Sequence, residues 1–233
     1  MSKLCTNQFV GKLIALLQEA GPDKFDDAVA QAKGQLAAEQ RNGLYKLFNS
    51  QIATLKDRGV PRQIIEALQD QKDTVVGKAS KITIGEGNIP FLPVIKPAYL
   101  GYYGLMSLVR NGDKQGYCYL DPTAITDEVQ TPDQVYYIYD VEDGESTRGK
   151  NPERAIDIFK KQSRLALTAT EAINLCILTD VLSRHYVWAA GSRYASSVRM
   201  PSVYLDFSDQ PRLFESLLNH SLGLWGSASC GSR

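Results

Sequence analysis

Arginine, glycine and serine gather in the last part of the chain, where they predict an anion-binding pocket. Gly191-Ser192-Arg193 follows an apolar run, and Arg199 comes shortly after it. Every basic residue between 162 and 233 is arginine, whose forked guanidinium suits carboxylates and phosphates. Residues 226–232 are rich in glycine and serine, so their N–H groups and hydroxyls can cradle an anion. The residues predicted from this pattern to line the pocket are Ser192, Arg193, Arg199, His220, Ser227, Ser229 and Cys230.

Two other interpretations of this region stay open. Residues 226–232 are also typical of a frayed terminus, although the apolar residues Leu222, Leu224 and Trp225 favour an anchored segment. Cys230 follows His220 closely, and a thiol beside an imidazole can form a nucleophile–base pair. Such a pair would make the protein a hydrolase or a transferase, but cysteine and histidine also fall close together by chance.

A run of carboxylates offers oxygen ligands of the kind that divalent cations prefer. Asp140, Glu142, Asp143 and Glu145 lie within one short stretch. They lack the fixed spacing of a coordination loop, so a solvated strand end with an Asp-Gly turn is favoured over a metal site. No glycine-rich phosphate loop, HExxH, GxSxG or EF-hand loop occurs in the sequence. We therefore predict neither a metal nor a cofactor.

Pairs of tyrosines alternate along two predicted strands. Tyr117 and Tyr119 share one strand face, and so do Tyr137 and Tyr139. An aromatic sheet face can stack nucleobases, but packing against helices is favoured because no RNA-binding motif accompanies it and the surrounding region is acidic. Lys plus Arg and Asp plus Glu both number 26, so the net charge also disfavours a nucleic-acid partner.

Composition indicates a folded protein in a reducing compartment. The chain has 233 residues and is 43% hydrophobic, which is enough to bury a core without the support of disulfide bonds or metal ions. No apolar stretch has the length of a signal peptide or a membrane span. The four cysteines lie far apart, which is typical of reduced thiols. We expect a cytoplasmic protein with no membrane partner.

Residues 1–78 are predicted to be helical and residues 79–233 to form an α+β domain. Apolar residues recur at helical spacing over 25–36 and again over 44–55, with Asn42-Gly43 between the two predicted helices. Packing on an internal core is favoured for these helices. The alternative is an arm that binds a partner or forms a homo-oligomer.

In the second region, strands and helices come in blocks rather than in strict alternation. We expect strands at 82–84, 117–120, 135–141, 185–190 and 202–207, with a proline-containing edge strand at 89–95. Asn151-Pro152 opens a predicted helix, Thr168 with Glu171 forms a capping box, and Pro211 opens a last helix through Leu218. This order predicts α+β with a mixed or antiparallel sheet, flanking helices, and the helical region packed on or beside it.

Six short segments, in order, resemble a bacterial family, common in actinobacteria, that is catalogued only as a domain of unknown function. They are 89–91, 135–141, 167–173, Gly191-Ser192-Arg193, Arg199-Met200-Pro201 and 224–230. The resemblance covers roughly residues 88–233 and implies no activity. It adds Asn219 to the matching polar positions, beside Ser192, Arg193, Arg199, His220 and Cys230.

The function therefore stays a set of hypotheses. The first is a cytoplasmic binding or interaction protein with a small-anion pocket near the C-terminus. The alternatives are an enzyme with a Cys230–His220 pair and a helical-arm scaffold or dimerisation protein.

Overall fold

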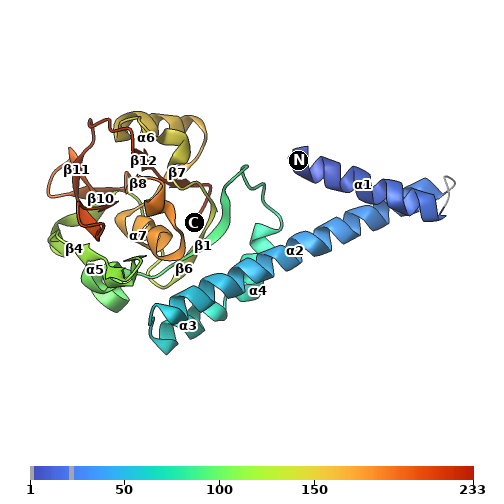
Figure 1. Cartoon of the computed structure of the whole chain (residues 1–233), viewed down its shortest axis with the longest axis horizontal. Coiled ribbons are helices and arrows are strands. Elements are labelled where there is room, and N and C mark those ends of the chain that lie inside the picture. The colour runs from blue at the N-terminus through green and yellow to red at the C-terminus, as the bar shows by residue number, and fades with distance from the viewer. Residues whose placement is uncertain (1–2, 21–23) are drawn as a thin grey trace.

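The α+β class predicted from the sequence is confirmed. The computed structural model describes residues 3–20 and 24–233, and in the first helix the side chains of residues 7–19. Helices dominate the N-terminal part, and short strands and helices make up the rest (Figure 1). Within the described residues, no helix combines the length and the apolar character needed to cross a membrane.

Four helices form the N-terminal region: α1 (Lys3–Ala20), α2 (Phe25–Asp57), α3 (Arg62–Gln69) and α4 (Lys72–Ala79). The predicted break at Asn42-Gly43 is wrong, because α2 continues through it. Gly43 has only open space where a Cβ would lie. Glycine inside a helix costs about 1 kcal/mol. Burial of apolar side chains further along α2, such as Phe48 and Leu55, outweighs that cost.

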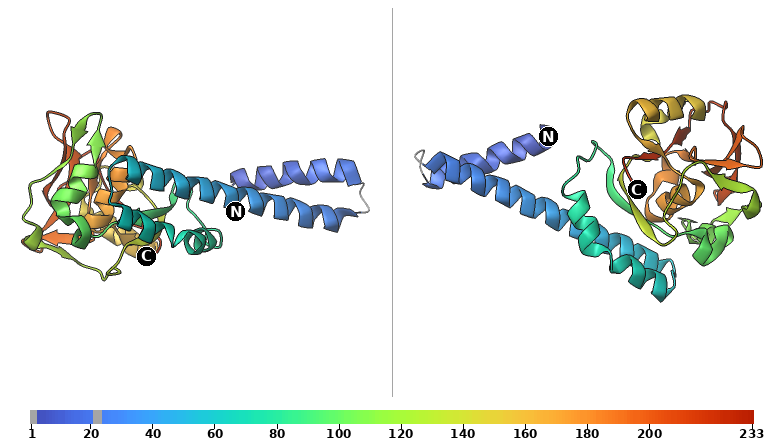
Figure 2. Two further views of the ribbon diagram at one scale, coloured as in Figure 1. Left: turned by 90° about the horizontal axis from the view of Figure 1, so that it is seen from below. Right: turned by 180° about the vertical axis from the view of Figure 1, so that it is seen from behind.

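The helical region has two parts that differ in their surroundings. α1 packs along the first part of α2, and the pair projects away from the sheet domain as an arm (Figures 1 and 2). The second part of α2 joins the core, where the ring of Phe48 stacks on Tyr137 at 5.8 Å between centroids. A single hydrophobic cluster runs from Leu44 through α3 and α4 into the sheet domain. Hydrophobic packing is therefore continuous across residues 78 and 79.

A two-stranded antiparallel ribbon and one buried helix lie next to α2. β1 (Ile89–Val94) pairs with β6 (Tyr136–Val141), as the edge-strand prediction for 89–95 implied. α7 (Ala169–Leu178) packs on β1 and is buried along nearly its whole length. The predicted capping box is present: Thr168 accepts a hydrogen bond from the Glu171 N–H, and Glu171 accepts one from the Thr168 N–H.

The largest sheet has five strands and is mixed. Its order is β12 (Trp225–Ser227), β8 (Tyr186–Trp188), β10 (Arg199–Leu205), β11 (Pro211–Leu217) and β4 (Tyr117–Cys118). The two outer pairs are parallel, and the two inner pairs are antiparallel.

The last predicted helix is therefore wrong, because residues 211–217 form β11. This strand pairs with β10 on one side and with β4 on the other, so neighbouring strands, rather than a helix, satisfy its backbone groups. Pro211 fits the first position of a strand as well as the first turn of a helix, which makes it ambiguous as a sequence signal.

Successive cross-strand rows of this sheet alternate between core and outer face. Val187, Val203, Leu213 and Cys118 form a row that is buried in the core. The adjacent row on the outer face contains Tyr204, Arg212 and Tyr117.

The two predicted tyrosine faces have different environments. Tyr137 and Tyr139 are buried, as expected for packing against helices. Tyr117 and Tyr119 are each 49% exposed, although the ring of Tyr117 meets the ring of Tyr103, in the helix Pro97–Leu108, edge-on at 6.5 Å between centroids. The expectation of packing against helices therefore holds only in part for this pair. Tyr117 lies in β4 at the edge of the sheet, a placement that alternation alone does not predict.

Shorter elements connect these parts. They are α5 (Pro97–Leu108), β2 (Arg110–Asn111), β3 (Lys114–Gln115), η2 (Pro122–Ala124), β5 (Ile125–Asp127), η3 (Glu145–Thr147), α6 (Pro152–Lys161), β7 (Leu165–Ala166), η4 (Val181–Ser183), β9 (Ser192–Tyr194) and β13 (Ser229–Cys230). Asn151 caps α6 through its side chain, as the Asn151-Pro152 signal predicted. The short strand predicted at 82–84 does not form.

Candidate functional site

The Gly-Ser-Arg loop and the C-terminal segment both bond to β7 or to Leu167, which follows it. β13 pairs antiparallel with β7, and the Gly191 N–H donates to the Leu167 carbonyl at 2.9 Å. A Cβ on Gly191 would lie 2.6 Å from the Ala166 carbonyl oxygen, so only glycine permits this approach. The C-terminal segment thus folds back beside the loop, and both segments are anchored.

Ser192 is buried and holds the start of α7 rather than facing a cavity. Its Oγ accepts from the Ala169 N–H at 2.8 Å and donates to Asp127 Oδ1 at 2.6 Å. Burial raises the pKa of Asp127, although the hydrogen bond from Ser192 opposes that rise. Ser192 therefore has a positioning role, because it links the loop to α7.

Arg193 bonds mainly to its own loop. Its Nη1 donates to the Ala190 carbonyl at 3.0 Å and to the Ser192 carbonyl at 2.9 Å. The other terminal nitrogen, Nη2, lies 3.9 Å from a carboxylate oxygen of Glu128. These contacts fix the guanidinium in place at the edge of a cavity described below.

The serines of the C-terminal segment are buried. Ser229 Oγ accepts from Arg164 Nε at 2.8 Å, and Arg164 also forms an ion pair with Asp140 at 2.5 Å. Ser227 Oγ is buried without a hydrogen-bond partner in the described part of the chain. Neither hydroxyl is open to a ligand from solvent.

Cys230 does not have the environment of a catalytic thiol. It is fully buried on β13, and burial raises the pKa of its thiol to about 12. The thiol is therefore protonated near neutral pH, whereas a nucleophilic cysteine needs the thiolate. Cys118, Cys176 and Cys230 are free, and the side chain of Cys5 lies outside the described residues.

Arg199 and His220 lie at a different place from the loop. They line a shallow cavity of about 290 Å³ with Glu215, and Arg199 is ion-paired to that carboxylate. Asn219 is exposed next to His220. No hydrogen bond joins His220 to Cys230 among the described residues. The structure therefore divides the predicted set. Arg193, Ser229 and Cys230 lie around β7, and Ser227 lies in β12, paired with β8. Arg199, Asn219 and His220 lie around the end of β11.

A cavity of about 330 Å³ beside the Gly-Ser-Arg loop combines apolar walls with several cations. Phe159 and Ala190 are buried at its walls, next to the half-buried Ile156. The charged residues around it are Glu128, Lys160, Arg164 and Arg193. The sequence pointed to Arg193 but missed Lys160 and Arg164. The signal available was the end of the amphipathic helix α6, where Lys160 follows Phe159.

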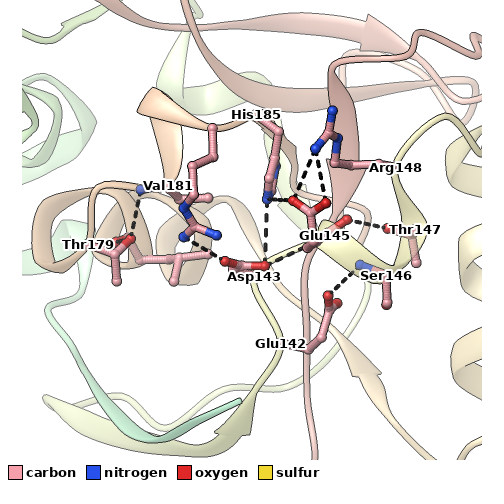
Figure 3. A network of polar contacts seen from close by, with 12 residues as sticks. Glu142, Asp143, Glu145, Ser146, Thr147, Arg148, Thr179, Val181 and His185 are labelled. Carbon is pink, nitrogen blue, oxygen red and sulfur yellow. Dashed lines mark hydrogen bonds and ion pairs between the residues drawn. The ribbon is translucent and has the colours of Figure 1, made fainter. Parts of the chain in front are cut away.

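Three carboxylates of the predicted acidic cluster, Asp140, Asp143 and Glu145, pair with arginines, whereas Glu142 accepts a hydrogen bond from the Ser146 N–H. Asp143 lies 2.8 Å from Arg184 and 3.6 Å from His185 Nε2, and Glu145 lies 3.0 Å from Arg148 (Figure 3). Burial by itself would raise the pKa of Asp143, but His185 and Arg184 hold it well below its usual range. Within the described residues, no group of His, Cys, Asp and Glu side chains has the arrangement of a metal site.

Comparison with known families matches most of the chain. The model of a family of unknown function (DUF5701) matches residues 46–231. The match includes the cavity beside the Gly-Ser-Arg loop and leaves out α1 and the first part of α2. Neither the curated proteins nor the solved structures contain a match to the chain.

Proposed function

The chain belongs to DUF5701, a family of unknown function, and we propose that it is a binding protein for a small amphipathic anion. Such a ligand has an apolar body and one negatively charged head. The proposed site is the cavity between α6 and the Gly-Ser-Arg loop. The observation that carries the proposal is the combination of apolar walls with Lys160, Arg164 and Arg193 against a single carboxylate, Glu128.

The size and chemistry of the cavity support a small molecule. Its volume of about 330 Å³ falls in the range of ligand sites, which are mostly apolar with a few placed polar groups. Asp140 and Ser229 already occupy Arg164. Lys160 is exposed, and no carboxylate oxygen lies within 4.0 Å of its ammonium among the described residues. Lys160 and the outer edge of Arg193 are therefore the groups proposed to receive the anionic head.

A series of straight-chain carboxylates tests this proposal by isothermal titration calorimetry. Each methylene that enters the cavity should strengthen binding by about 0.8 kcal/mol, which is about fourfold in Kd. Lys160→Gln should weaken octanoate binding by about tenfold, because a charge-assisted contact is lost. Lys161→Gln is the matched control, since Lys161 is the exposed neighbour that does not line the cavity.

Two results would contradict the proposal. One is octanoate binding no more tightly than acetate, which would leave the apolar walls without a role. The other is an equal loss in Lys160→Gln and Lys161→Gln, which would indicate general attraction to surface charge.

Self-association through the arm is a second candidate function. α1 packs on α2, and Val10 and Ile14 on α1 are 45% and 50% exposed. The family match begins at residue 46, so this arm is an addition to the part that the family shares. An apolar face on a projecting helix pair is suited to a second copy of the same arm.

Light scattering coupled to size exclusion tests the arm. The wild-type mass should rise above the monomer mass with concentration, and Val10→Glu combined with Ile14→Glu should restore the monomer. Gln8→Glu places one new charge elsewhere on α1 and should leave association unchanged. A wild-type protein that stays monomeric at every concentration would remove this candidate.

A reducing compartment such as the cytoplasm also stays a proposal. The free thiols of Cys118, Cys176 and Cys230 support it. The bacterial origin that the resemblance implied stays a prediction as well.

A further inference from the structure

A second cavity lies where the end of α2 meets the β2–β3 hairpin and the end of α7. Its volume is about 350 Å³, and its lining includes Thr54, Arg58, Arg110, Asn111 and Thr179. It is distinct from the cavity beside the Gly-Ser-Arg loop, because the two share no lining residue. None of its residues belongs to the site predicted from the sequence.

Two guanidinium groups meet at this cavity without a carboxylate between them. Among the described residues, no carboxylate oxygen lies within 4.0 Å of either Arg58 or Arg110. Burial and the positive charge of Arg110 lower the pKa of Arg58, while Asp57 has a smaller opposing effect. The two guanidiniums therefore repel each other, which makes it less favourable to keep both charged at this cavity.

The carboxylate that also lines the cavity does not relieve this repulsion. Asp180 is 80% exposed and lies 3.7 Å from Arg184, outside the pair of guanidiniums. The neighbouring hydroxyls are already used as donors: Thr54 donates to the Ser50 carbonyl and Thr179 to the Leu175 carbonyl. Arg58 and Arg110 are thus the two cavity-lining cations that have no carboxylate partner among the described residues.

One of the two guanidiniums is held in place by its own hairpin. Arg110 pairs with Gln115 across β2 and β3. With the amide oxygen turned toward the guanidinium, Gln115 accepts from Nη1 at 2.6 Å and from Nη2 at 2.9 Å. Among the described residues, the Arg58 side chain has no such partner, and it reaches the cavity from the C-terminal end of α2. A group with two or more acceptor oxygens would satisfy both arginines at once.

We propose that this cavity binds a phosphoryl dianion between Arg58, which caps the C-terminal end of α2, and Arg110 of the β2–β3 hairpin. The two negative charges of the phosphoryl group balance the two guanidinium charges. Its tetrahedrally arranged oxygens can accept hydrogen bonds from both guanidiniums, which belong to different parts of the fold. The bound ion joins the helical region to the sheet domain, so binding stabilises their contact. Free phosphate and the phosphate of a nucleotide offer the same chemistry.

Calorimetry with inorganic phosphate on the full chain, in a buffer of low ionic strength, tests the site. Wild-type protein should bind phosphate saturably and melt at a higher temperature in its presence, since the ion binds the folded state. Arg58→Gln and Arg110→Gln should each weaken phosphate binding by at least about tenfold. Arg62→Gln is the matched control, because Arg62 lies near the same helix end and is ion-paired to Glu66 on the surface.

Further measurements distinguish free phosphate from a nucleotide as the ligand, and this cavity from the one beside the Gly-Ser-Arg loop. A nucleoside diphosphate that binds at least about tenfold more tightly than phosphate, and loses that affinity in Arg58→Gln, would assign the phosphoryl group to a nucleotide. Lys160→Gln should leave phosphate binding unchanged, and Arg58→Gln should leave octanoate binding unchanged. Either proposal can therefore fail while the other stands.

The stability of the Arg58 variant without ligand adds an independent check. Because removal of the Arg58 guanidinium relieves repulsion with Arg110, Arg58→Gln should melt no lower than wild type when phosphate is absent. The proposal is overturned by a wild type that shows no saturable binding at millimolar phosphate. It is also overturned if Arg58→Gln and Arg110→Gln both keep the wild-type affinity, or if Lys160→Gln abolishes phosphate binding and Arg58→Gln does not.

Discussion

At the residue scale, the interaction whose loss should cost the most stability is a buried ion pair that the sequence analysis did not predict. Glu171 is fully buried at the start of α7, and Arg233 donates to both of its carboxylate oxygens, at 2.7 and 2.9 Å. Tyr136 adds a hydrogen bond from its hydroxyl at 2.9 Å. Glu171 is thus both half of a capping box and the counter-ion of a half-buried arginine, so one side chain joins three segments.

Glu171→Gln should therefore destabilise the protein strongly. Removing one partner of a buried pair typically costs about 3–5 kcal/mol, because the other charge stays buried and unpaired. Chemical denaturation measures the loss. The control is Glu66→Gln, which breaks the surface pair with Arg62 and should cost about 1 kcal/mol or less. Equal effects of the two substitutions would contradict this role for Glu171.

The second residue-scale prediction concerns His185, which is buried beside Asp143 and Glu145 (Figure 3). Burial lowers the pKa of His185, but Asp143, the Tyr186 carbonyl and Glu145 together more than offset that effect, so the net pKa is raised. A raised pKa in the folded state stabilises the protein below the unfolded pKa of about 6.5. That stability is lost as the pH rises through the folded-state pKa. The depressed pKa of Asp143 acts in the opposite sense, and its contribution is lost as the pH falls.

The pH dependence of the unfolding free energy measures this effect. The difference between wild type and His185→Gln should be larger near about pH 6 than near about pH 9. A His185→Gln difference that grows with pH would show that the histidine is neutral in the folded protein.

At the scale of elements, two glycines differ in whether the structure requires the absence of a side chain. Gly191 brings the loop against β7, and a Cβ there would collide with backbone oxygens at 2.6 and 2.8 Å. Gly43 lies in α2 with nothing near its missing side chain. The sequence predicted a break between helices at Gly43 and a loop at Gly191, but only Gly191 is required by a close approach.

Alanine at these two positions should therefore change stability in opposite directions. Gly191→Ala should destabilise by about 1–3 kcal/mol, because the backbone must move apart. Gly43→Ala should stabilise by about 0.5–1 kcal/mol, because alanine is the better helix former. Thermal unfolding followed by circular dichroism gives both values. A stabilising Gly191→Ala would disprove the tight contact with β7.

At the scale of the whole molecule, the second part of α2 and the sheet domain share one core. Phe48 is buried against Phe91 and Tyr137, which belong to the β1–β6 ribbon. The helical circular dichroism signal comes largely from the N-terminal region, which contains most of the helical residues. Both tryptophans, Trp188 and Trp225, lie in the five-stranded sheet and report on that part by fluorescence. The two probes thus follow different parts of the molecule.

Phe48→Ala should destabilise both parts together. The expected loss is about 3–5 kcal/mol, as for other buried phenylalanines. Far-ultraviolet circular dichroism and tryptophan fluorescence should give coincident denaturation curves, before and after the substitution. Two separate transitions, with only the helical one shifted, would mean that residues 1–78 and 79–233 unfold independently.

The sequence by itself determined the elements that local chemistry fixes. The helix starts at Asn151 and Thr168 were predicted because capping depends on residues three positions apart. The strand at 135–141 was predicted because its β-branched and aromatic run has no competing helical pattern. The small, close-packing nature of Gly191 was also visible, although the reason for it was not.

Only the tertiary structure decided how distant segments combine. It made a strand of residues 211–217, because pairing on both sides outweighs a local helix signal. It separated His220 from the loop of Arg193, and it placed Arg58 and Arg110 around one cavity. Burial, ion pairing and cavity shape depend on contacts between residues far apart in the chain, and a single sequence carries no local signal for such contacts.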